Sequence, residues 1–160
     1  MKNLAERQAW MGILAKAELA ALEGCVDRLE ELPGYEFLRS PEIGLAMVRG
    51  RAGGVGDAFN LGEMTLTRCV VRLEGGQGSR RQETGEQESK AGFGSVGGRS
   101  HRHAELAALC DALLQDGRWY GQVAKKVIEP LQRSLQQTAE QRQRQTAATQ
   151  VEFFTMLRGE

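Results

Sequence analysis

The chain has 160 residues, of which 41% are hydrophobic and 26% charged, an ordinary composition for a globular protein with one core. Its 21 basic and 21 acidic residues cancel, which argues against a protein that binds nucleic acid or membranes through long-range attraction. Any anion site must therefore be local. Three cysteines without a C-x-x-C pair, no apolar run of membrane-spanning length and a polar start without a signal-peptide core predict a cytoplasmic protein with reduced thiols.

The first part of the chain reads as helical. Asn3 and Glu6 have the spacing of a capping box, so a helix is expected to begin near Leu4. Apolar residues at helical spacing predict a second helix over residues 17–31, which Pro33 and Gly34 end.

The pattern then changes to short runs rich in β-branched and aromatic residues. The runs at 35–40, 43–51 and 63–73 are separated by Pro or Gly turns, which predicts a three-stranded antiparallel meander. Residues 74–97 are rich in Gly, Gln, Glu and Ser and poor in apolar side chains. This composition predicts a flexible surface insertion, within which residues 79–91 are expected to be mobile and dispensable.

Helical periodicity returns near residue 103, where an apolar stripe runs to Leu114 and predicts a helix that is buried against the sheet and ends at Gly117. Residues 131–150 predict a largely solvated helix anchored by Leu131 and Leu135. The run at 151–160 predicts a terminal strand, apolar on both faces, in which Phe153 or Phe154 contacts a partner or packs in the core. The expected fold is a single α+β domain over 1–160, with N-terminal helices, a small antiparallel sheet and C-terminal helices packed on it.

A glycine cluster, RAGGVG at 51–56, precedes the last predicted strand. It lacks the Lys and Ser/Thr of a P-loop. One interpretation is a tight connection between strands, in which Gly53, Gly54 and Gly56 supply positive φ angles. The other is a backbone nest for phosphate oxygens, flanked by the guanidinium groups of Arg51 and Arg68.

The two histidines of the chain lie in RSHRHAE, at 99–105. They are two residues apart, so they share a face in a strand but not in a helix, and a metal site would need ligands from elsewhere. His103 is expected to begin the helix and His101 to lie on the surface. His103 is the one candidate for general acid–base chemistry, and a structural or interface role is the alternative.

Four blocks of the sequence resemble the G subunit of the bacterial carbon–phosphorus lyase core complex. They are RQAWMGILAKA (7–17), RAGGVGDAFNLGEMTLTRCVVRL (51–73), GRSHRHAELAALCDALLQ (98–115) and VEFFTMLRGE (151–160), in that order. The chain departs from the family pattern at Ser100 and His101, where a sequence closer to G-R-D is expected, and in the extra length at 79–91.

The resemblance implies a cytoplasmic subunit that works with the H, I and L subunits to displace adenine from ATP by an alkylphosphonate. The J subunit then cleaves the carbon–phosphorus bond. It implies no cofactor or metal on this chain, no activity of the chain alone, closest contact with the I subunit and a homo-oligomer as a further possibility for the isolated chain. The alternatives are an assembly subunit without ligand contact and a self-sufficient phosphate-metabolite enzyme that uses His103. The predicted ligand or interface residues are Arg51, Gly53, Gly54, Gly56, Asn60, Glu63, Thr65, Thr67 and Arg68.

Overall fold

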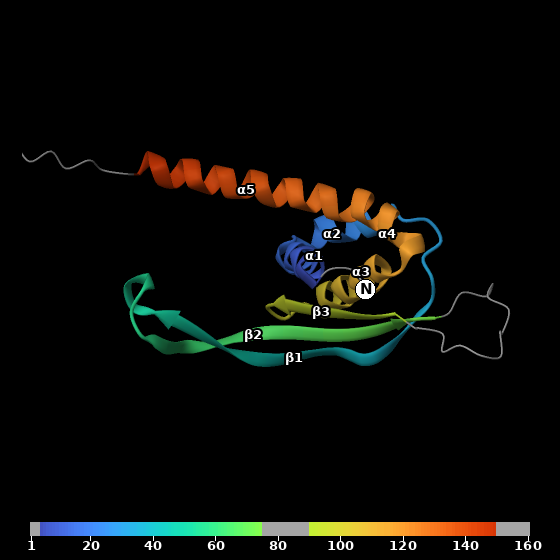
Figure 1. The fold of residues 1–160 in the computed structure, drawn as a ribbon, viewed down its shortest axis with the longest axis horizontal. Coiled ribbons are helices and arrows are strands. Elements are labelled where there is room, and N and C mark those ends of the chain that lie inside the picture. Colours follow the sequence, from blue (N-terminus) through green and yellow to red (C-terminus); the bar gives the residue numbers. More distant parts are fainter. Residues whose placement is uncertain (1–3, 75–89, 150–160) are drawn as a thin grey trace, which may run out of the picture.

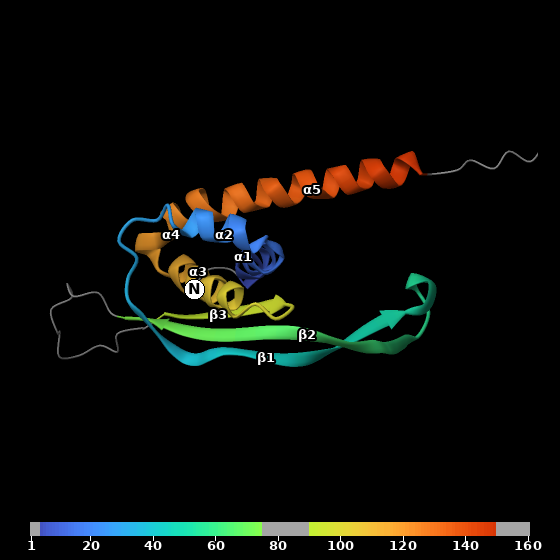
Figure 2. The same ribbon diagram turned by 180° about the vertical axis from the view of Figure 1, so that it is seen from behind.

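The computed structural model describes residues 4–74 and 90–149, which form an α+β fold with all helices on one side of a three-stranded antiparallel sheet (Figures 1 and 2). In chain order the elements are α1 (Leu4–Lys16), α2 (Leu19–Val26), β1 (Tyr35–Arg51), η1 (Ala52–Gly54), β2 (Ala58–Leu73), β3 (Ala91–Gly97), α3 (His101–Gln115), α4 (Gly117–Val123), η2 (Ala124–Ile128) and α5 (Glu129–Ala148). The predicted fold class is confirmed for these elements. The predicted terminal strand at 151–160 lies outside the described residues, as does Asn3.

The N-terminal helices bury one face each against the core. Helix α1 begins at Leu4, as predicted, and buries Trp10 and Leu14. Helix α2 ends at Val26, so the predicted helix over 17–31 is too long. The apolar spacing continues past the helix because Leu29, in the turn that follows, is also buried.

The sheet has the order β1-β2-β3, with both pairs antiparallel. The two strands predicted at 35–40 and 43–51 are one strand, β1, that continues through Pro41. Its pairing with β2 is irregular between Arg39 and Glu42. Because β1 is an edge strand, a proline that lacks an N–H can be accommodated at such an irregularity without breaking the strand.

The third strand, β3, falls within residues 74–97, where a flexible insertion was predicted. That prediction is wrong for 91–97, whereas residues 75–89 lie outside the described part of the chain. Gly92 and Gly94 point at α3, where an added Cβ would lie 2.0 Å from the carbonyl oxygens of Ala108 and Ala104 respectively. These glycines belong to a stretch with the composition of a linker, but they are required because β3 approaches α3 too closely for a larger side chain.

Helix α3 is the centre of the core and packs on β2 and β3, which confirms the predicted helix buried against the sheet. It ends at Gln115, and Asp116 caps the next helix through its side chain, so Gly117 begins α4 and does not end α3 as predicted. Helix α5 is mostly exposed, with Leu131 buried and Leu135 half-buried, as its polar sequence predicted. No helix in the described ranges has the length and apolar character needed to span a bilayer.

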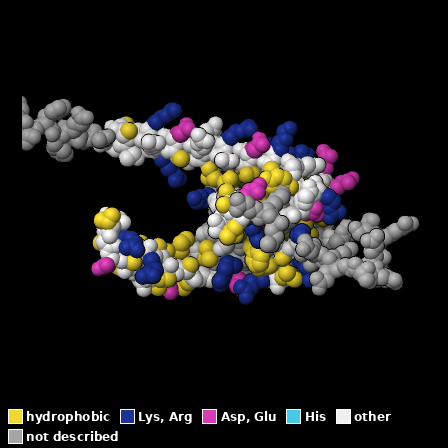
Figure 3. Space-filling view, viewed as in Figure 1, with side chains coloured by type: hydrophobic (Ala, Val, Ile, Leu, Met, Phe, Trp, Pro, Cys, Tyr) yellow, Lys and Arg dark blue, Asp and Glu magenta, His cyan; other side chains and the backbone are white. Residues whose placement is uncertain are grey.

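The β1–β2 ladder is much longer than β3 and projects from the body as a two-stranded arm (Figure 1). Strand β3 pairs with β2 only from Leu66 to Arg72. Residues 45–65, here called the hairpin arm, therefore lie beyond the end of β3, and the loop at 52–57 forms its tip. Helix α5 projects in the same direction, so the arm and α5 are separated by open space on that side of the molecule (Figure 3).

Candidate functional site

The hairpin arm holds most of the residues predicted to bind a ligand or a partner. It carries Arg51, Gly53, Gly54, Gly56, Asn60, Glu63 and Thr65. Six of its large hydrophobic side chains are exposed: Leu45, Met47, Val55, Phe59, Leu61 and Met64. Figure 3 shows hydrophobic side chains along the arm and Lys or Arg side chains toward its tip. A two-stranded ribbon with this much apolar surface is marginal in water by itself, so the arm has the character of a contact surface.

The tip loop is a compact turn with its own internal contacts. Gly53 and Gly54 have φ angles of 58° and 81°, which confirms that both supply left-handed conformations. Gly56 does not have a positive φ, so the prediction for that glycine is wrong. Gly56 is required for another reason: an added Cβ would lie 2.7 Å from the carbonyl oxygen of Ala52, which accepts a hydrogen bond from the Gly56 N–H at 2.8 Å.

Arg51 is held by the loop that follows it. Its Nη1 donates to the carbonyl oxygen of Gly56 at 3.1 Å, across the base of the turn. A guanidinium has five N–H donors, so this bond leaves donors that can reach an anion at the exposed tip. The bond also means that Arg51 stabilises the turn, whether or not a ligand binds.

Arg51 and Arg68 are not brought together around the loop. Arg51 pairs in register with Ala58 at the tip, whereas Arg68 pairs with Glu42 near the body. The Arg68 side chain lies 3.7 Å from the Glu42 carboxylate, and both are about half exposed. One phosphate in the tip loop could therefore contact Arg51 and not Arg68.

The two predicted threonines have structural contacts at the base of the arm. Thr67 is fully buried, and its Oγ1 donates to the carbonyl oxygen of Gly98 at 2.8 Å. The carbonyl oxygen of Thr65 accepts from the Gly98 N–H at 2.9 Å. Gly98 has a φ of 97°, so these bonds fix the left-handed turn that joins β3 to α3.

Asn60 and Glu63 lie on the exposed part of β2, opposite Arg49 and Met47 of β1 respectively. In the described part of the chain, the side chains of Asn60 and Glu63 form no hydrogen bond and no ion pair. Their positions leave the amide and the carboxylate available to another molecule.

His103 lies inside the body, far along the chain from the arm. Helix α3 begins at His101, two residues earlier than expected, and His101 is exposed as predicted. The His103 side chain is buried, and its Nε2 is 2.8 Å from the carbonyl oxygen of Leu14. This contact ties α3 to α1 and favours a structural role. Within the described residues, no three His, Cys, Asp or Glu side chains are grouped as a metal site would require.

Ser100, where the resemblance led us to expect a sequence closer to G-R-D, has a clear structural role. Ser100 is the N-cap of α3, and its side chain accepts a hydrogen bond from the His103 N–H at 3.2 Å. Serine and aspartate both serve as N-caps, so either residue could begin the helix at this position.

A cleft of about 990 Å³ lies elsewhere, between α1 and α5. Its lining residues include Gly12, Ile13, Lys16, Leu135 and Arg142. None of the predicted site residues lines it. Most of the predicted site residues therefore lie on the hairpin arm, and none of them lies in this cleft.

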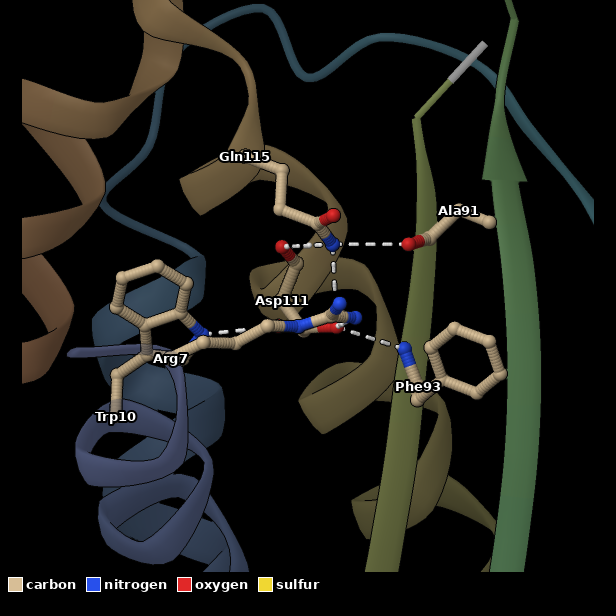
Figure 4. Close-up of polar contacts among 6 residues, drawn as sticks. All are labelled: Arg7, Trp10, Ala91, Phe93, Asp111 and Gln115. Carbon is tan, nitrogen blue, oxygen red and sulfur yellow. Dashed lines mark hydrogen bonds and ion pairs between the residues drawn. The ribbon is translucent and has the colours of Figure 1, made fainter. Parts of the chain in front are cut away.

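Sequence reasoning missed a buried polar centre around Asp111 (Figure 4). This fully buried carboxylate accepts hydrogen bonds from the side chains of Arg7, Trp10 and Gln115 and from the Phe93 N–H. It joins α1, α3 and β3. The sequence did contain a signal for this centre, because a carboxylate, Asp111, stands in the middle of the apolar stripe Leu109–Leu114.

A second group that sequence reasoning missed links the sheet to α3. The Tyr35 hydroxyl donates to Glu105, which also pairs with Arg102 at 3.2 Å. Burial, followed by the bond to Glu105, raises the pKa of Tyr35 to about 12. Burial also raises the pKa of the Cys69 thiol to about 11, so that thiol stays protonated at neutral pH.

Comparison with known proteins finds relatives over nearly the whole chain. The model of a family described as phosphonate metabolism protein PhnG matches residues 5–159. The chain is 39% identical over 158 residues to the alpha-D-ribose 1-methylphosphonate 5-triphosphate synthase subunit PhnG of Rhizobium meliloti (strain 1021). That match covers 99% of this chain and 92% of the relative. The resemblance predicted from the sequence is confirmed, and the chain belongs to the PhnG family of phosphonate metabolism proteins.

Proposed function

We propose that the chain is a non-autonomous subunit of an alpha-D-ribose 1-methylphosphonate 5-triphosphate synthase. With the H, I and L subunits, it would support transfer of ribose 5-triphosphate from ATP to an alkylphosphonate, with displacement of adenine. The observation that carries the proposal is the 39% identity, over almost the full length of both chains, to a protein named as a subunit of that synthase.

The positions of the predicted site residues support a role that depends on other chains. Glycines and Arg51 occupy the tip of the arm, whereas Thr67 and His103 are buried in the body and bonded to backbone carbonyls. A catalytic centre needs its acid, base and anion-binding groups within reach of one substrate. The ten candidates do not converge in this way, which favours an active site completed by another subunit.

The proposed partners are the H, I, J and L subunits, with the I subunit in closest contact. The chain would hold no cofactor of its own, and ATP and the alkylphosphonate would be substrates of the complex. A cytoplasmic location is part of the proposal. The three free cysteines are all buried, as expected for thiols that remain reduced.

The hairpin arm is the element best suited to reach the active site of a partner. Its tip is exposed, carries Arg51 and contains two glycines with left-handed backbone conformations. A phosphonate or triphosphate oxygen brought to this tip by a partner would find guanidinium donors and an accessible backbone. In this proposal the tip loop contacts substrate, and the apolar sides of the arm contact protein.

The decisive experiment is reconstitution of the synthase from purified subunits, followed by measurement of adenine release from ATP with each subunit omitted. Adenine release should stop when this chain is omitted and should be absent when it is assayed alone. Adenine release by the chain alone, abolished by His103→Ala, would instead establish the self-sufficient enzyme.

Substitutions at Arg51 distinguish substrate contact from assembly. If the tip binds substrate, Arg51→Ala should lower adenine release by the assembled complex while the subunits still co-purify. Arg49→Ala, two residues away on the same strand, is the matched control and should have little effect on either. Loss of co-purification by Arg51→Ala would support the alternative of an assembly subunit without ligand contact.

A further inference from the structure

The hairpin arm has one strand edge that the rest of the described chain leaves open. Strand β2 pairs with β1 on one side over its whole length, but β3 covers its other side only from Leu66 to Arg72. The Thr65 carbonyl is used by Gly98. Residues 58–64 are all exposed, and no strand of the described ranges pairs with their outer edge.

An exposed strand edge of this kind is unusual in a soluble chain. Proteins normally shorten such edges, place Lys or Pro on them or cover them, because their free N–H and C=O groups pair readily with another strand. The open edge of β2 carries neither Lys nor Pro. It reads AFNLGEM, with Glu63 as its one charged residue, and carries Phe59, Leu61 and Met64 as exposed hydrophobic side chains.

The side chains along this edge are self-complementary, which means that two copies of the strand can pair antiparallel with favourable contacts between opposite residues. In an antiparallel pairing of two copies centred between Leu61 and Gly62, Asn60 of each copy lies opposite Glu63 of the other. Phe59 then lies opposite Met64. An amide facing a carboxylate and a thioether facing an aromatic ring are favourable cross-strand pairs, and no like charges face each other.

The existing ladder shows that these pairs lie on matching faces. Asn60 and Glu63 pair with Arg49 and Met47, which are two residues apart on β1 and so share one face. By the same reasoning, the β1 partners of Phe59 and Met64 are Gly50 and Ala46, so both side chains lie on the opposite face. The irregularity at Leu61 permits this, because three residues of β2 from 60 to 62 span two of β1.

We propose that two copies of this chain associate by antiparallel pairing of their β2 edges at residues 59–64. The second copy's strand would continue the line of β3, beginning where Gly97 ends. Its tip loop would then lie beside the turn at Gly98. The proposal concerns a second copy and is independent of whether the tip loop binds an anion.

Cysteine cross-linking tests both the partner and the register. The three native cysteines are buried, so an introduced thiol on the arm is the one that reacts in the folded chain. Two differently tagged chains, Asn60→Cys and Glu63→Cys, are co-expressed alone and together with the other synthase subunits. Opposite residues in an antiparallel pair have Cα atoms about 4.5–5.5 Å apart, which suits a disulfide.

Mild oxidation should give a disulfide-linked dimer from the mixture of the two variants and none from either variant alone. The control mixture pairs Glu63→Cys with Val55→Cys, a thiol at the exposed tip that has no counterpart in the proposed register. Failure of the first mixture to cross-link, in a folded chain whose two thiols react fully with a maleimide, would overturn the proposal. Equal cross-linking in the control mixture would also overturn it.

The mass in solution gives an independent measurement. The 17.6 kDa chain should have about twice this mass by light scattering, and Met64→Glu, which places a carboxylate opposite the Phe59 ring, should return it to a monomer. Leu45→Glu, at an exposed position on β1, should leave the mass unchanged. A monomeric wild-type chain at high micromolar concentration that also fails to cross-link within the complex would contradict the inference.

Discussion

Arg7 on α1 and Asp111 on α3 are 104 residues apart in the chain, and their side chains form a bidentate ion pair with Nη2 2.6 Å from Oδ2. Asp111 is fully buried, and Phe93 of β3 donates its N–H to the same carboxylate. The Asp111 side chain therefore holds α1 and β3 against the central helix α3.

Replacement of Asp111 by Ala should lower the free energy of unfolding by about 3–5 kcal/mol, because it leaves several buried donors without an acceptor. Urea denaturation of the purified chain measures this change. Arg133→Gln, which removes the exposed pair with Glu129 at 3.2 Å, is the control and should cost about 0.3–0.5 kcal/mol. Equal effects of the two substitutions would show that the buried carboxylate is not a central contact.

Gly92→Ala and Gly94→Ala should each destabilise the chain by about 3 kcal/mol or more, the upper end of the cost of overpacking, because the added Cβ meets helix backbone. The matched control is Gly121→Ala in α4, where an added Cβ meets nothing within 4 Å. That substitution should raise stability by about 0.5–1 kcal/mol through helix propensity. Thermal melts of the three variants provide the comparison, and a harmless Gly94→Ala would contradict the close approach of β3 to α3.

Gly54→Val should reduce adenine release by the reconstituted synthase more than Arg49→Ala does, because valine strongly resists a φ of 81°. Gly56→Val should have a similar effect through its clash with Ala52. The thermal stability of the isolated chain should change little, since the tip loop lies outside the core. Full activity of both valine variants would show that the shape of the loop is unimportant to the complex.

The raised pKa of Tyr35 predicts a change at alkaline pH. A pKa raised from 10.0 to about 12 means that the neutral hydroxyl stabilises the folded state fully below about pH 10. That contribution is lost as the pH rises toward 12. The difference in unfolding free energy between wild type and Tyr35→Phe should therefore shrink over this range.

Tyrosinate absorbance provides the direct measurement, because the chain has two tyrosines and each single variant leaves one. Tyr120→Phe should retain a tyrosine that ionises near pH 12. Ionisation of that remaining tyrosine near pH 10 in the folded chain would contradict the contact between Tyr35 and Glu105.

The three thiols should react slowly with a thiol reagent at neutral pH in the folded chain and quickly after unfolding. All three cysteines are buried, and burial raises the pKa of Cys110 to about 12. Reaction rates with and without urea measure this protection. Rapid reaction of a folded thiol would show local opening of the core.

Local periodicity and contiguous blocks of residues were enough to predict the N-terminal helices, an antiparallel sheet after them, the buried character of α3 and the family. They did not reveal that β1 is one strand or that β3 exists. Tertiary structure alone decided the role of the glycines in β3, since composition cannot distinguish a glycine of a linker from one that admits a neighbouring helix. It likewise decided that Arg68 faces Glu42 and that Thr67 and His103 bond to backbone carbonyls. Such contacts join segments tens of residues apart, and no spacing within one segment specifies them. The open edge of β2 follows from the different lengths of two strands, which only their pairing reveals.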